Sequence, residues 1–155
     1  LYDIQIEANH IKMGTLGKAY GSFGAYILAS SHIISYLLNR AKPLIYATSL
    51  SLYDTLLGHN ALKYILKNKE TLKKQIKQRQ EIVQNILGLK MDGLILPIVI
   101  DDNEKVLQIK REFEDDGFAI GAIRKPTVQR AILRIIARLE HKTKLFDTLC
   151  KKITL

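Results

Sequence analysis

The stretch Met13–Tyr26, "MGTLGKAYGSFGAY", places one lysine, Lys18, among four glycines. Glycine-rich loops with a lysine are typical of nucleotide-phosphate sites, but two motifs of that kind can be excluded. The P-loop motif needs a glycine where this chain has Lys12 and a serine or threonine where it has Ala19. The dinucleotide motif begins G-x-G, and these glycines are never two residues apart.

Lys18 could instead act as an amine that attacks a carbonyl group. Such an amine must lose its proton, and burial beside other cations lowers the pKa of a lysine enough for that. The small neighbours Gly17 and Ala19 leave room for a flat carbonyl compound, and the Thr15 hydroxyl could bind an anion such as phosphate. These residues together suit pyridoxal phosphate, whose aldehyde a lysine holds as a Schiff base. A glycine-rich turn with a surface lysine remains the alternative.

The composition indicates one ordinary globular domain or two small lobes, since the chain has 155 residues, 47% of them hydrophobic and 25% charged. The sequence has no apolar run of about 18 residues, so no membrane span is predicted. The start "LYDIQIEANH" is not a signal peptide. One cysteine, Cys150, leaves no partner for an internal disulfide and fits a reducing cytosol. We therefore expect a cytoplasmic protein, and the abrupt start at Leu1 suggests a piece of a longer chain.

The formal charge of +9 would attract nucleic acid, anionic lipid or phosphorylated small molecules. Much of the excess lies at residues 62–80, "LKYILKNKETLKKQIKQRQ". A solvated helix face is one interpretation, and a basic module that binds RNA or DNA is another. Nucleic-acid surfaces interleave aromatic and basic residues, and Tyr64 is the one aromatic side chain among these lysines. The histidines show no metal-ligand spacing with Cys150, so no metal is expected.

The hydrophobic pattern predicts an α/β fold. Beyond about residue 88 the pattern resembles a small α+β unit. Strands are expected at 25–29, 44–48, 93–100, 118–123 and 131–137, and helices at 32–41, 52–88, 104–116 and from His141. We expect the long helix to be broken or bent near Gly58 and to end at Gly88. We also expect Asn103 to cap the helix that follows. Pro97 places its strand at an edge or a bulge.

Four stretches in the same order resemble the α-oxoamine synthases, pyridoxal-phosphate enzymes of fold type I. They are "GTLGKAYGSFGAYI", "RAKPLIYATSLS", "GFAIGAIRKPTV" and "LRIIARLEH". The resemblance implies the C-terminal part of such an enzyme. Residues 1–60 would then be the end of the large cofactor-binding domain, 61–88 a linking helix and 89–155 a small α+β domain.

The resemblance also implies roles for five residues. Lys18 would hold the cofactor aldehyde and later act as the base, and Thr15 would bind the cofactor phosphate. Thr48 matches a position that reaches the phosphate of the neighbouring subunit's cofactor, which implies a homodimer. Thr127 would contact substrate, and Arg134 would bind the amino-acid carboxylate, a task suited to a guanidinium fork.

Within the family, "AIRKPTV" favours the acyltransferase of biotin biosynthesis, which condenses L-alanine with pimeloyl-CoA or a pimeloyl carrier thioester. Another member, of the glycine C-acetyltransferase type, is the alternative. Departures from the family pattern lie around the substrate mouth, so they put the substrate in doubt. They are Lys125 and Gln129 in place of prolines, Ile132 in place of an arginine, and Ser51-Leu52 in place of a proline pair. Separately, Ala47 replaces a usual serine and weakens the phosphate contact expected of Thr48.

The family also carries a "DEAH"-like stretch upstream of its lysine, with an aspartate for the pyridine nitrogen and a histidine that stacks on the ring. No such stretch precedes Lys18 in this sequence. Without the acidic partner the pyridine nitrogen is a poorer electron sink. We therefore expect this chain to be a fragment that is not active alone.

Overall fold

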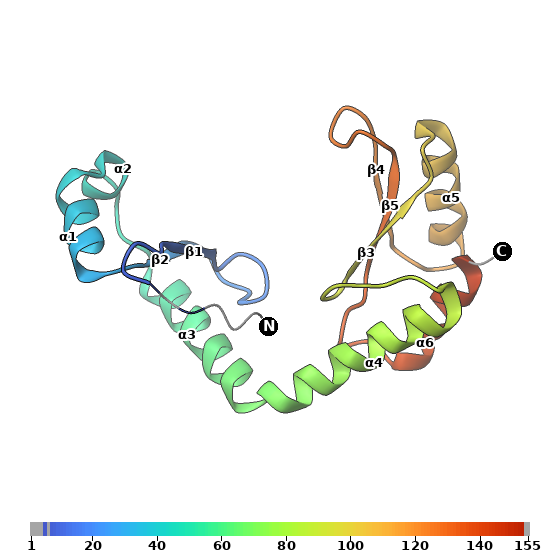
Figure 1. Cartoon of the computed structure of the whole chain (residues 1–155), viewed down its shortest axis with the longest axis horizontal. Coiled ribbons are helices and arrows are strands. Elements are labelled where there is room, and N and C mark those ends of the chain that lie inside the picture. The colour runs from blue at the N-terminus through green and yellow to red at the C-terminus, as the bar shows by residue number, and fades with distance from the viewer. Residues whose placement is uncertain (1–4, 6, 154–155) are drawn as a thin grey trace. The chain divides into compact units, whose positions relative to one another are not determined.

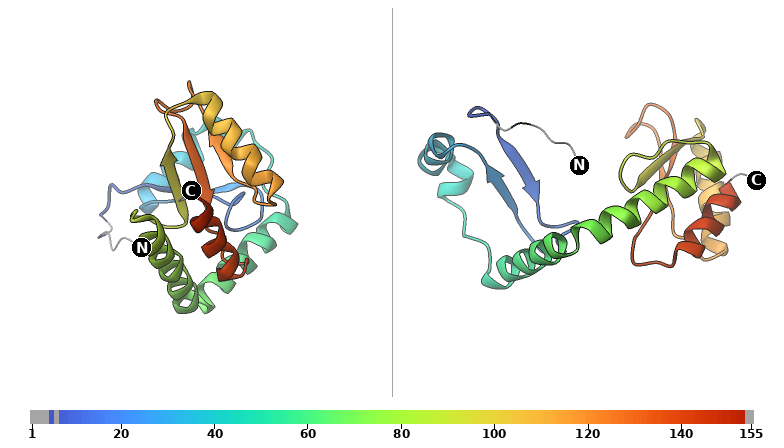
Figure 2. Two further views of the ribbon diagram at one scale, coloured as in Figure 1. Left: turned by 90° about the vertical axis from the view of Figure 1, so that its right-hand side faces the viewer. Right: turned by 60° about the horizontal axis from the view of Figure 1, so that its bottom comes forward.

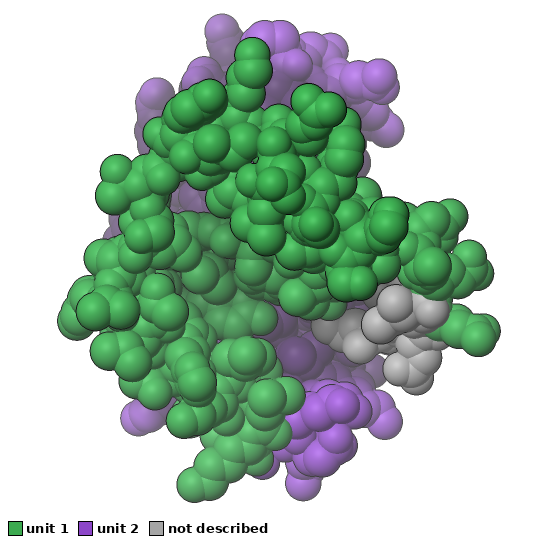
Figure 3. Space-filling view, turned by 90° about the vertical axis from the view of Figure 1, so that its left-hand side faces the viewer, with its two compact units in different colours: residues 1–68 green, residues 69–155 purple. Residues whose placement is uncertain are grey.

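The computed structural model describes residue 5 and residues 7–153, and it divides the chain into two compact units. Unit 1 is residues 1–68 and unit 2 is residues 69–155, coloured separately in Figure 3. Unit 1 contains β1 Lys12–Thr15, β2 Ala25–Leu28, α1 Ser31–Arg40, α2 Lys42–Ile45 and α3 Leu52–Lys67 (Figure 1). Unit 2 contains α4 Lys69–Leu87, β3 Ile95–Val99, α5 Asn103–Asp115, β4 Gly121–Ile123, β5 Ile132–Ile136 and α6 Thr143–Ile153. The boundary lies inside the predicted linking helix, and the assignment to a large and a small enzyme domain stays a prediction.

The glycine-rich stretch of unit 1 folds as an antiparallel hairpin. Strand β1 pairs with β2 so that Gly14 lies opposite Tyr26. The predicted strand at 25–29 is confirmed as β2, whereas β1 was not predicted. A loop of nine residues, 16–24, joins the two strands and carries Lys18.

Two helices follow the hairpin where one helix and one strand were predicted. Helix α1 is confirmed, with Ser30 at its N-cap position. The predicted strand at 44–48 is wrong, because residues 42–45 form the short helix α2. Pro43 lies in the first turn of α2, where the fixed backbone angle of proline suits a helix and its missing N–H costs nothing.

The predicted long helix is two helices, α3 and α4, which meet at Asn68. A break in the helix near Gly58 is not found: α3 continues through this residue, and Gly58 is the buried residue of α3. At Asn68 the side-chain amide donates to the Tyr64 carbonyl at 2.8 Å, an alternative to continued helical bonding. Gly88 follows α4 with φ of 65°, as predicted for a helix end.

Unit 1 lacks a hydrophobic core of its own in its described part, where Gly58 is the one buried residue. Large apolar side chains stay in water instead, among them Tyr46 at 83% exposure and Leu52 at 82%. Full burial of such a side chain is worth about 1.5–3 kcal/mol. Unit 1 therefore gains little of the free energy that burial of these side chains would provide.

Unit 2 is a three-stranded antiparallel sheet, in the order β3-β5-β4, with helices on one face. Its core side chains come from the sheet, from all three helices and from the segments that flank them. They are Val83, Met91, Leu96, Val106, Phe113, Ile120, Ala131, Leu133, Ile135, Ala137, Phe146, Leu149 and Cys150. Helix α5 packs on β4 and β5, and α4 lies beside α6 (Figure 2). Strand β3 is an edge strand, as Pro97 predicted.

Two polar residues of unit 2 differ from expectation. Asp102, not Asn103, caps α5, because its Oδ1 accepts hydrogen bonds from the backbone N–H groups of Glu104 and Lys105. Arg79, which belongs to the lysine-rich segment, is 3% exposed. Its Nη2 donates to the His141 carbonyl at 2.6 Å, so it ties α4 to the turn before α6 and does not add to the basic surface.

Candidate active site

The loop that carries Lys18 is closed by three backbone hydrogen bonds. The Leu16 N–H donates to the Gly24 carbonyl at 2.8 Å, and the Ser22 N–H donates to the Leu16 carbonyl at 3.0 Å. The Gly21 N–H donates to the carbonyl of Lys18 itself at 3.0 Å. The lysine therefore projects from a turn whose backbone is fixed on both sides.

Helix α3 contacts the loop that carries Lys18. The Ser22 hydroxyl donates to the Asp54 carbonyl at 2.6 Å. A β-carbon on Gly58 would lie 3.5 Å from Cδ1 of Leu16, an ordinary van der Waals separation, so Leu16 of the loop lies against the helix at this point. Gly58 is buried there and does not break the helix.

The side chain of Lys18 is exposed, and no ion pair within residues 7–153 involves it. Thr15, three residues earlier, ends β1 and is exposed too. A primary amine without a carboxylate partner and a nearby hydroxyl are the donor groups that an aldehyde with a phosphate requires. The residues present fit pyridoxal phosphate on this ground.

Thr48 lies in the same unit, in the irregular segment between α2 and α3, and its side chain is exposed. Two residues later, Leu50 packs on the hairpin: a β-carbon on Gly24 would lie 2.6 Å from its Cδ1. No hydrogen bond between described residues joins Thr48 to Thr15 or Lys18. The role of Thr48 toward a second subunit stays a prediction.

Arg134 lies at the centre of the open face of the unit 2 sheet. Its neighbours on β5, Leu133 and Ile135, are buried in the core, so the alternation of a strand puts Arg134 on the opposite side. It is paired with Pro97 of β3 and Gly121 of β4. Neither neighbour has a long side chain, so the guanidinium has space across the sheet.

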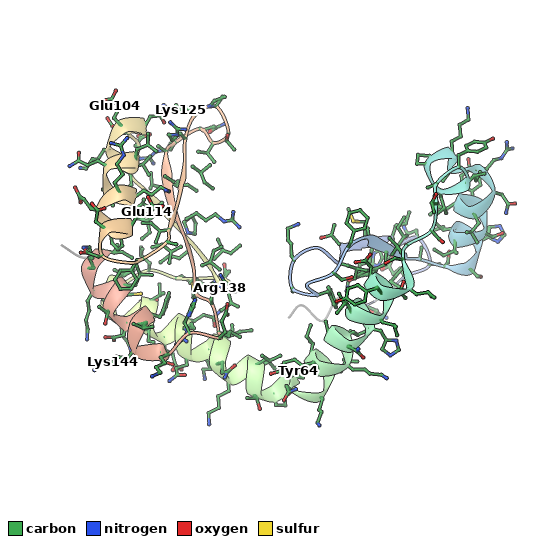
Figure 4. The ribbon with its side chains drawn as sticks, turned by 180° about the vertical axis from the view of Figure 1, so that it is seen from behind. Tyr64, Glu104, Glu114, Lys125, Arg138 and Lys144 are labelled. Carbon is green, nitrogen blue, oxygen red and sulfur yellow. The ribbon has the colours of Figure 1, made fainter. Side chains whose placement is uncertain are left out.

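Thr127 lies in the loop between β4 and β5, after a cis Lys125-Pro126 bond, and its side chain is exposed. The Lys125 N–H donates to Oδ1 of Asn103 at 3.2 Å, which joins this loop to the start of α5. Figure 4 shows Lys125 and Glu104 at the same end of unit 2. Thr127 and Arg134 thus belong to unit 2, and Thr15, Lys18 and Thr48 belong to unit 1.

Two lysines of helix α4 have glutamate partners on the same helix. Lys73 pairs with Glu70 at 3.2 Å, and Lys77 lies 3.9 Å from Glu81. No group of metal-ligating side chains exists among the described residues. Over the same residues, no helix is long and apolar enough to cross a membrane.

Sequence reasoning missed a pair of tyrosines beside Lys18. The rings of Tyr20 and Tyr26 meet edge to face, with centroids 6.4 Å apart. The missed signal was the strand β1: once residues 12–15 pair with 25–28, Tyr26 comes to lie across the hairpin from Gly14. The sequence predicted only the second of the two paired strands, at 25–29, so the pairing could not be seen.

Relatives of known sequence support the resemblance. The 8-amino-7-oxononanoate synthase of Helicobacter pylori strain J99 is 38% identical over 138 residues, which are 89% of this chain and 36% of the relative. That of Maricaulis maris is 33% identical over 141 residues, covering 90% of this chain and 36% of the relative. The chain thus spans little more than a third of the length of these relatives.

Solved structures share the fold. The 8-amino-7-oxononanoate synthase of Francisella tularensis matches with a TM-score of 0.72 and 21% identity, over 93% of this chain and 45% of that one. The serine palmitoyltransferase of Sphingomonas wittichii matches with a TM-score of 0.77 and 14% identity, over 90% and 37%. The predicted fold class, the C-terminal part of a fold-type-I enzyme, is confirmed. The family model of class I and II aminotransferases matches residues 3–153, and the chain belongs to that family.

Proposed function

We propose that this chain is part of a pyridoxal-phosphate acyltransferase that makes 8-amino-7-oxononanoate, CoA and CO2 from L-alanine and pimeloyl-CoA in biotin biosynthesis. The acyl donor could equally be a pimeloyl carrier thioester, and the enzyme acts as a cytoplasmic homodimer. The observation that carries the proposal is the Lys18 loop, which fixes the backbone of an exposed lysine that has no ion pair among the described residues. The named relatives supply the choice of reaction.

Two residues of unit 1 would hold the cofactor. Lys18 would bind the aldehyde carbon through Nζ, and the Thr15 hydroxyl would donate to the phosphate. Pyridoxal phosphate, when bound, draws electrons from the α-carbon of an amino acid and so makes that carbon acidic. The amine of Lys18 would then take up and return the proton at the α-carbon, which requires the lysine to stay within reach of one atom.

Two residues of unit 2 would handle the substrate. Arg134 would hold both carboxylate oxygens of alanine through its guanidinium fork, a geometry that fixes orientation as well as charge. The Thr127 hydroxyl would contact substrate from the loop after β4. The carbon–sulfur bond of the thioester breaks and a carbon–carbon bond to alanine forms, with loss of the carboxylate as CO2.

Borohydride reduction in the presence of pyridoxal phosphate tests the role of Lys18 in the protein at its natural length. We expect the reduced cofactor on Lys18, found by peptide mass spectrometry, and loss of that label in Lys18→Arg. Labelling spread evenly over surface lysines would contradict the proposal, since the sequence offers many other lysines as internal controls.

The alternative within the family is an enzyme of the glycine C-acetyltransferase type, which stays open because the departures at Lys125 and Gln129 put the substrate in doubt. Release of CoA from pimeloyl-CoA with alanine, against release from acetyl-CoA with glycine, distinguishes the two. We expect the alanine and pimeloyl-CoA pair to give the larger kcat/KM. A larger value for the acetyl-CoA and glycine pair would overturn this choice of substrates.

A nucleic-acid-binding module is the alternative of another class, supported by the net charge of +9. The ion pairs of Lys73 and Lys77 along α4 weigh against it. Binding to a mixed-sequence DNA duplex at 50 and 200 mM salt tests it, because an affinity set by phosphate contacts falls steeply with salt. We expect no salt-sensitive complex.

A further inference from the structure

The segment that follows β3, residues 100–103, contacts the loop that carries Thr127, residues 124–131. Val99 at the end of β3 and Ile123 at the end of β4 both pair with Ile132 at the start of β5. The segment after β3 and the loop after β4 therefore leave the sheet at the same end. The contacts between them lie entirely within unit 2.

The end of the loop nearest β5 is held by three contacts. The N–H groups of Ile100 and Asp101 both donate to the carbonyl of Ala131, at 2.9 and 3.0 Å. Nε of Arg130 lies 3.1 Å from Oδ2 of Asp101, an ion pair between segment and loop. Asp101 has φ of 63°, a left-handed conformation that aspartate adopts more readily than most residues other than glycine. Asp101 thus holds this end of the loop through its backbone and its side chain.

The end of the loop nearest β4 is held by Asn103. Its Oδ1 accepts a hydrogen bond from the Lys125 N–H at 3.2 Å. A proline, which the resembled family has at this position, lacks an N–H and could not make this bond. Asn103 is the first residue of α5, and the carboxylate of Asp102 caps that helix. The acceptor oxygen is therefore presented from a fixed helix start.

Thr127 lies between these two ends, two residues after Lys125 and three before Arg130. Within the loop, the Val128 N–H donates to the Arg124 carbonyl at 3.3 Å, so the chain turns around Thr127. The side chain of Thr127 is exposed, and none of these bonds uses its hydroxyl. The hydroxyl is therefore left for a ligand while the backbone on both sides of it is held.

We propose that Asp101 and Asn103 are positioning residues for Thr127, which hold its hydroxyl where it meets the substrate. This rests on the proposed function, in which Thr127 contacts substrate. A loop that is fixed before the substrate arrives loses less conformational entropy when the substrate binds. Each contact is a single exposed hydrogen bond or ion pair, so each contributes a modest part of the effect.

The test uses the protein at its natural length with L-alanine and pimeloyl-CoA as substrates. Asn103→Ala removes the acceptor for the Lys125 N–H, and Asn103→Asp keeps an oxygen in its place. Asp101→Asn keeps a residue that tolerates the left-handed conformation and removes the charge of the ion pair. Thr127→Val removes the hydroxyl at nearly constant shape. Asn85→Ala, at an exposed asparagine of α4 in the same unit, is the matched control.

We expect Thr127→Val to raise the KM for one of the two substrates. Asn103→Ala should raise the KM for that same substrate by about two- to tenfold, the range that one hydrogen bond contributes. Asp101→Asn should act in the same direction by up to about fivefold, the range of an exposed ion pair. The kcat should change less than the KM. Asn103→Asp should restore the unmodified value, and Asn85→Ala should leave it unchanged.

Two further measurements separate positioning from a general loss of structure. Hydrogen exchange of the peptide that covers residues 124–131, followed by mass spectrometry, should be faster in Asn103→Ala than in Asn103→Asp or Asn85→Ala. In a protein that already carries Thr127→Val, Asn103→Ala should have no further effect on the KM, because the hydroxyl through which it acts is gone.

An unchanged KM in Asn103→Ala and Asp101→Asn, whatever the exchange rate of the loop, overturns the positioning role and leaves the proposed function standing. Additive effects of Asn103→Ala and Thr127→Val overturn it as well, since the two residues would then act independently. If the unmodified protein releases no CoA from pimeloyl-CoA with alanine, the proposed function is overturned, and this inference with it.

Discussion

Arg134 owes its availability to the alternation of strand β5. Leu133 is 2% and Ile135 1% exposed, and the residue between them must face the other way. Pro97 and Gly121 beside it leave the guanidinium unobstructed. A single residue thus combines an ordinary structural position with the proposed task of binding a carboxylate.

Replacing Arg134 with lysine tests that task. The lysine keeps the charge and loses the two-pronged geometry, so we expect the KM for alanine to rise about 10-fold or more, the loss typical of a hydrogen bond to a charged group. The KM for pimeloyl-CoA should change much less. Arg138→Lys, at an exposed arginine just beyond β5, is the control (Figure 4). Equal effects on both KM values would exclude a specific carboxylate contact.

Cys150, in contrast to Arg134, is a reactive group whose surroundings lower its reactivity. It is 0% exposed, and burial raises the pKa of its thiol to about 11, with the charge of Asp147 adding to the rise. The folded protein thus holds the thiol proton more tightly than the unfolded chain, whose ordinary value is 9.0. The raised pKa of the thiol therefore contributes to the free energy of unfolding. This contribution is fully present below about pH 9 and is lost as the pH rises through 11.

Alkylation by iodoacetamide at pH 8 measures this effect at one site, because the chain has a single cysteine. The thiolate is the reactive form, and a pKa higher by about two units lowers its population about 100-fold. We expect labelling of the native protein to be slower by at least that factor than labelling in urea. Similar rates in both conditions would show that the thiol is accessible and its pKa ordinary.

At the scale of elements, the β1–β2 hairpin depends on contacts with the segment between α2 and α3. Gly24 has φ of 111°, a conformation that other residues rarely adopt, and its α-carbon faces Leu50. The hairpin could not be predicted from local pattern alone, since Leu50 lies far along the chain. The same holds for the contact of Leu16 with Gly58, which joins two residues far apart in the sequence.

Gly24→Ala should open the Lys18 loop. The new methyl group would meet Leu50 at 2.6 Å, and the backbone conformation adds strain of about 1–3 kcal/mol. Trypsin cleavage after Lys18 is the measurement, and we expect it to become several-fold faster than in the unmodified protein. Gly17→Ala is the matched control, because its β-carbon would lie 3.6 Å from the nearest atom, the Ser22 carbonyl oxygen. Equal cleavage rates in the two variants would contradict the argument.

At the scale of the whole molecule, hydrophobic burial is unevenly divided. The core side chains all belong to residues 83–150, in unit 2, where sheet and helices bury them together. Unit 1 exposes large apolar side chains, including Phe23 at 71% and Tyr53 at 71%. Autonomous folding requires a buried core, so the units should differ in independence.

Residues 69–155 expressed alone should therefore fold, and residues 1–68 alone should not. We expect a cooperative thermal transition, followed by circular dichroism, for unit 2 and none for unit 1. Leu133→Ala in isolated unit 2 should lower its free energy of unfolding by about 2–5 kcal/mol, as expected for a fully buried leucine. A cooperative transition in isolated unit 1 would show that its apolar side chains find burial among themselves.

The sequence by itself determined the family, strand β2, helix α1, the edge position of β3 and the end of α4 at Gly88, and it predicted the role proposed for Lys18. These follow from local patterns: a glycine-rich motif, the spacing of hydrophobic residues within short segments, a proline within a strand and a glycine at the end of a helix. Only the tertiary structure decided that Gly58 is buried within a continuous helix, that Arg79 is buried, that residues 44–48 are not a strand and that Tyr26 lies over Gly14. The physical reason is that each of these depends on a partner distant in sequence or on competition between local conformations, which only the folded chain resolves.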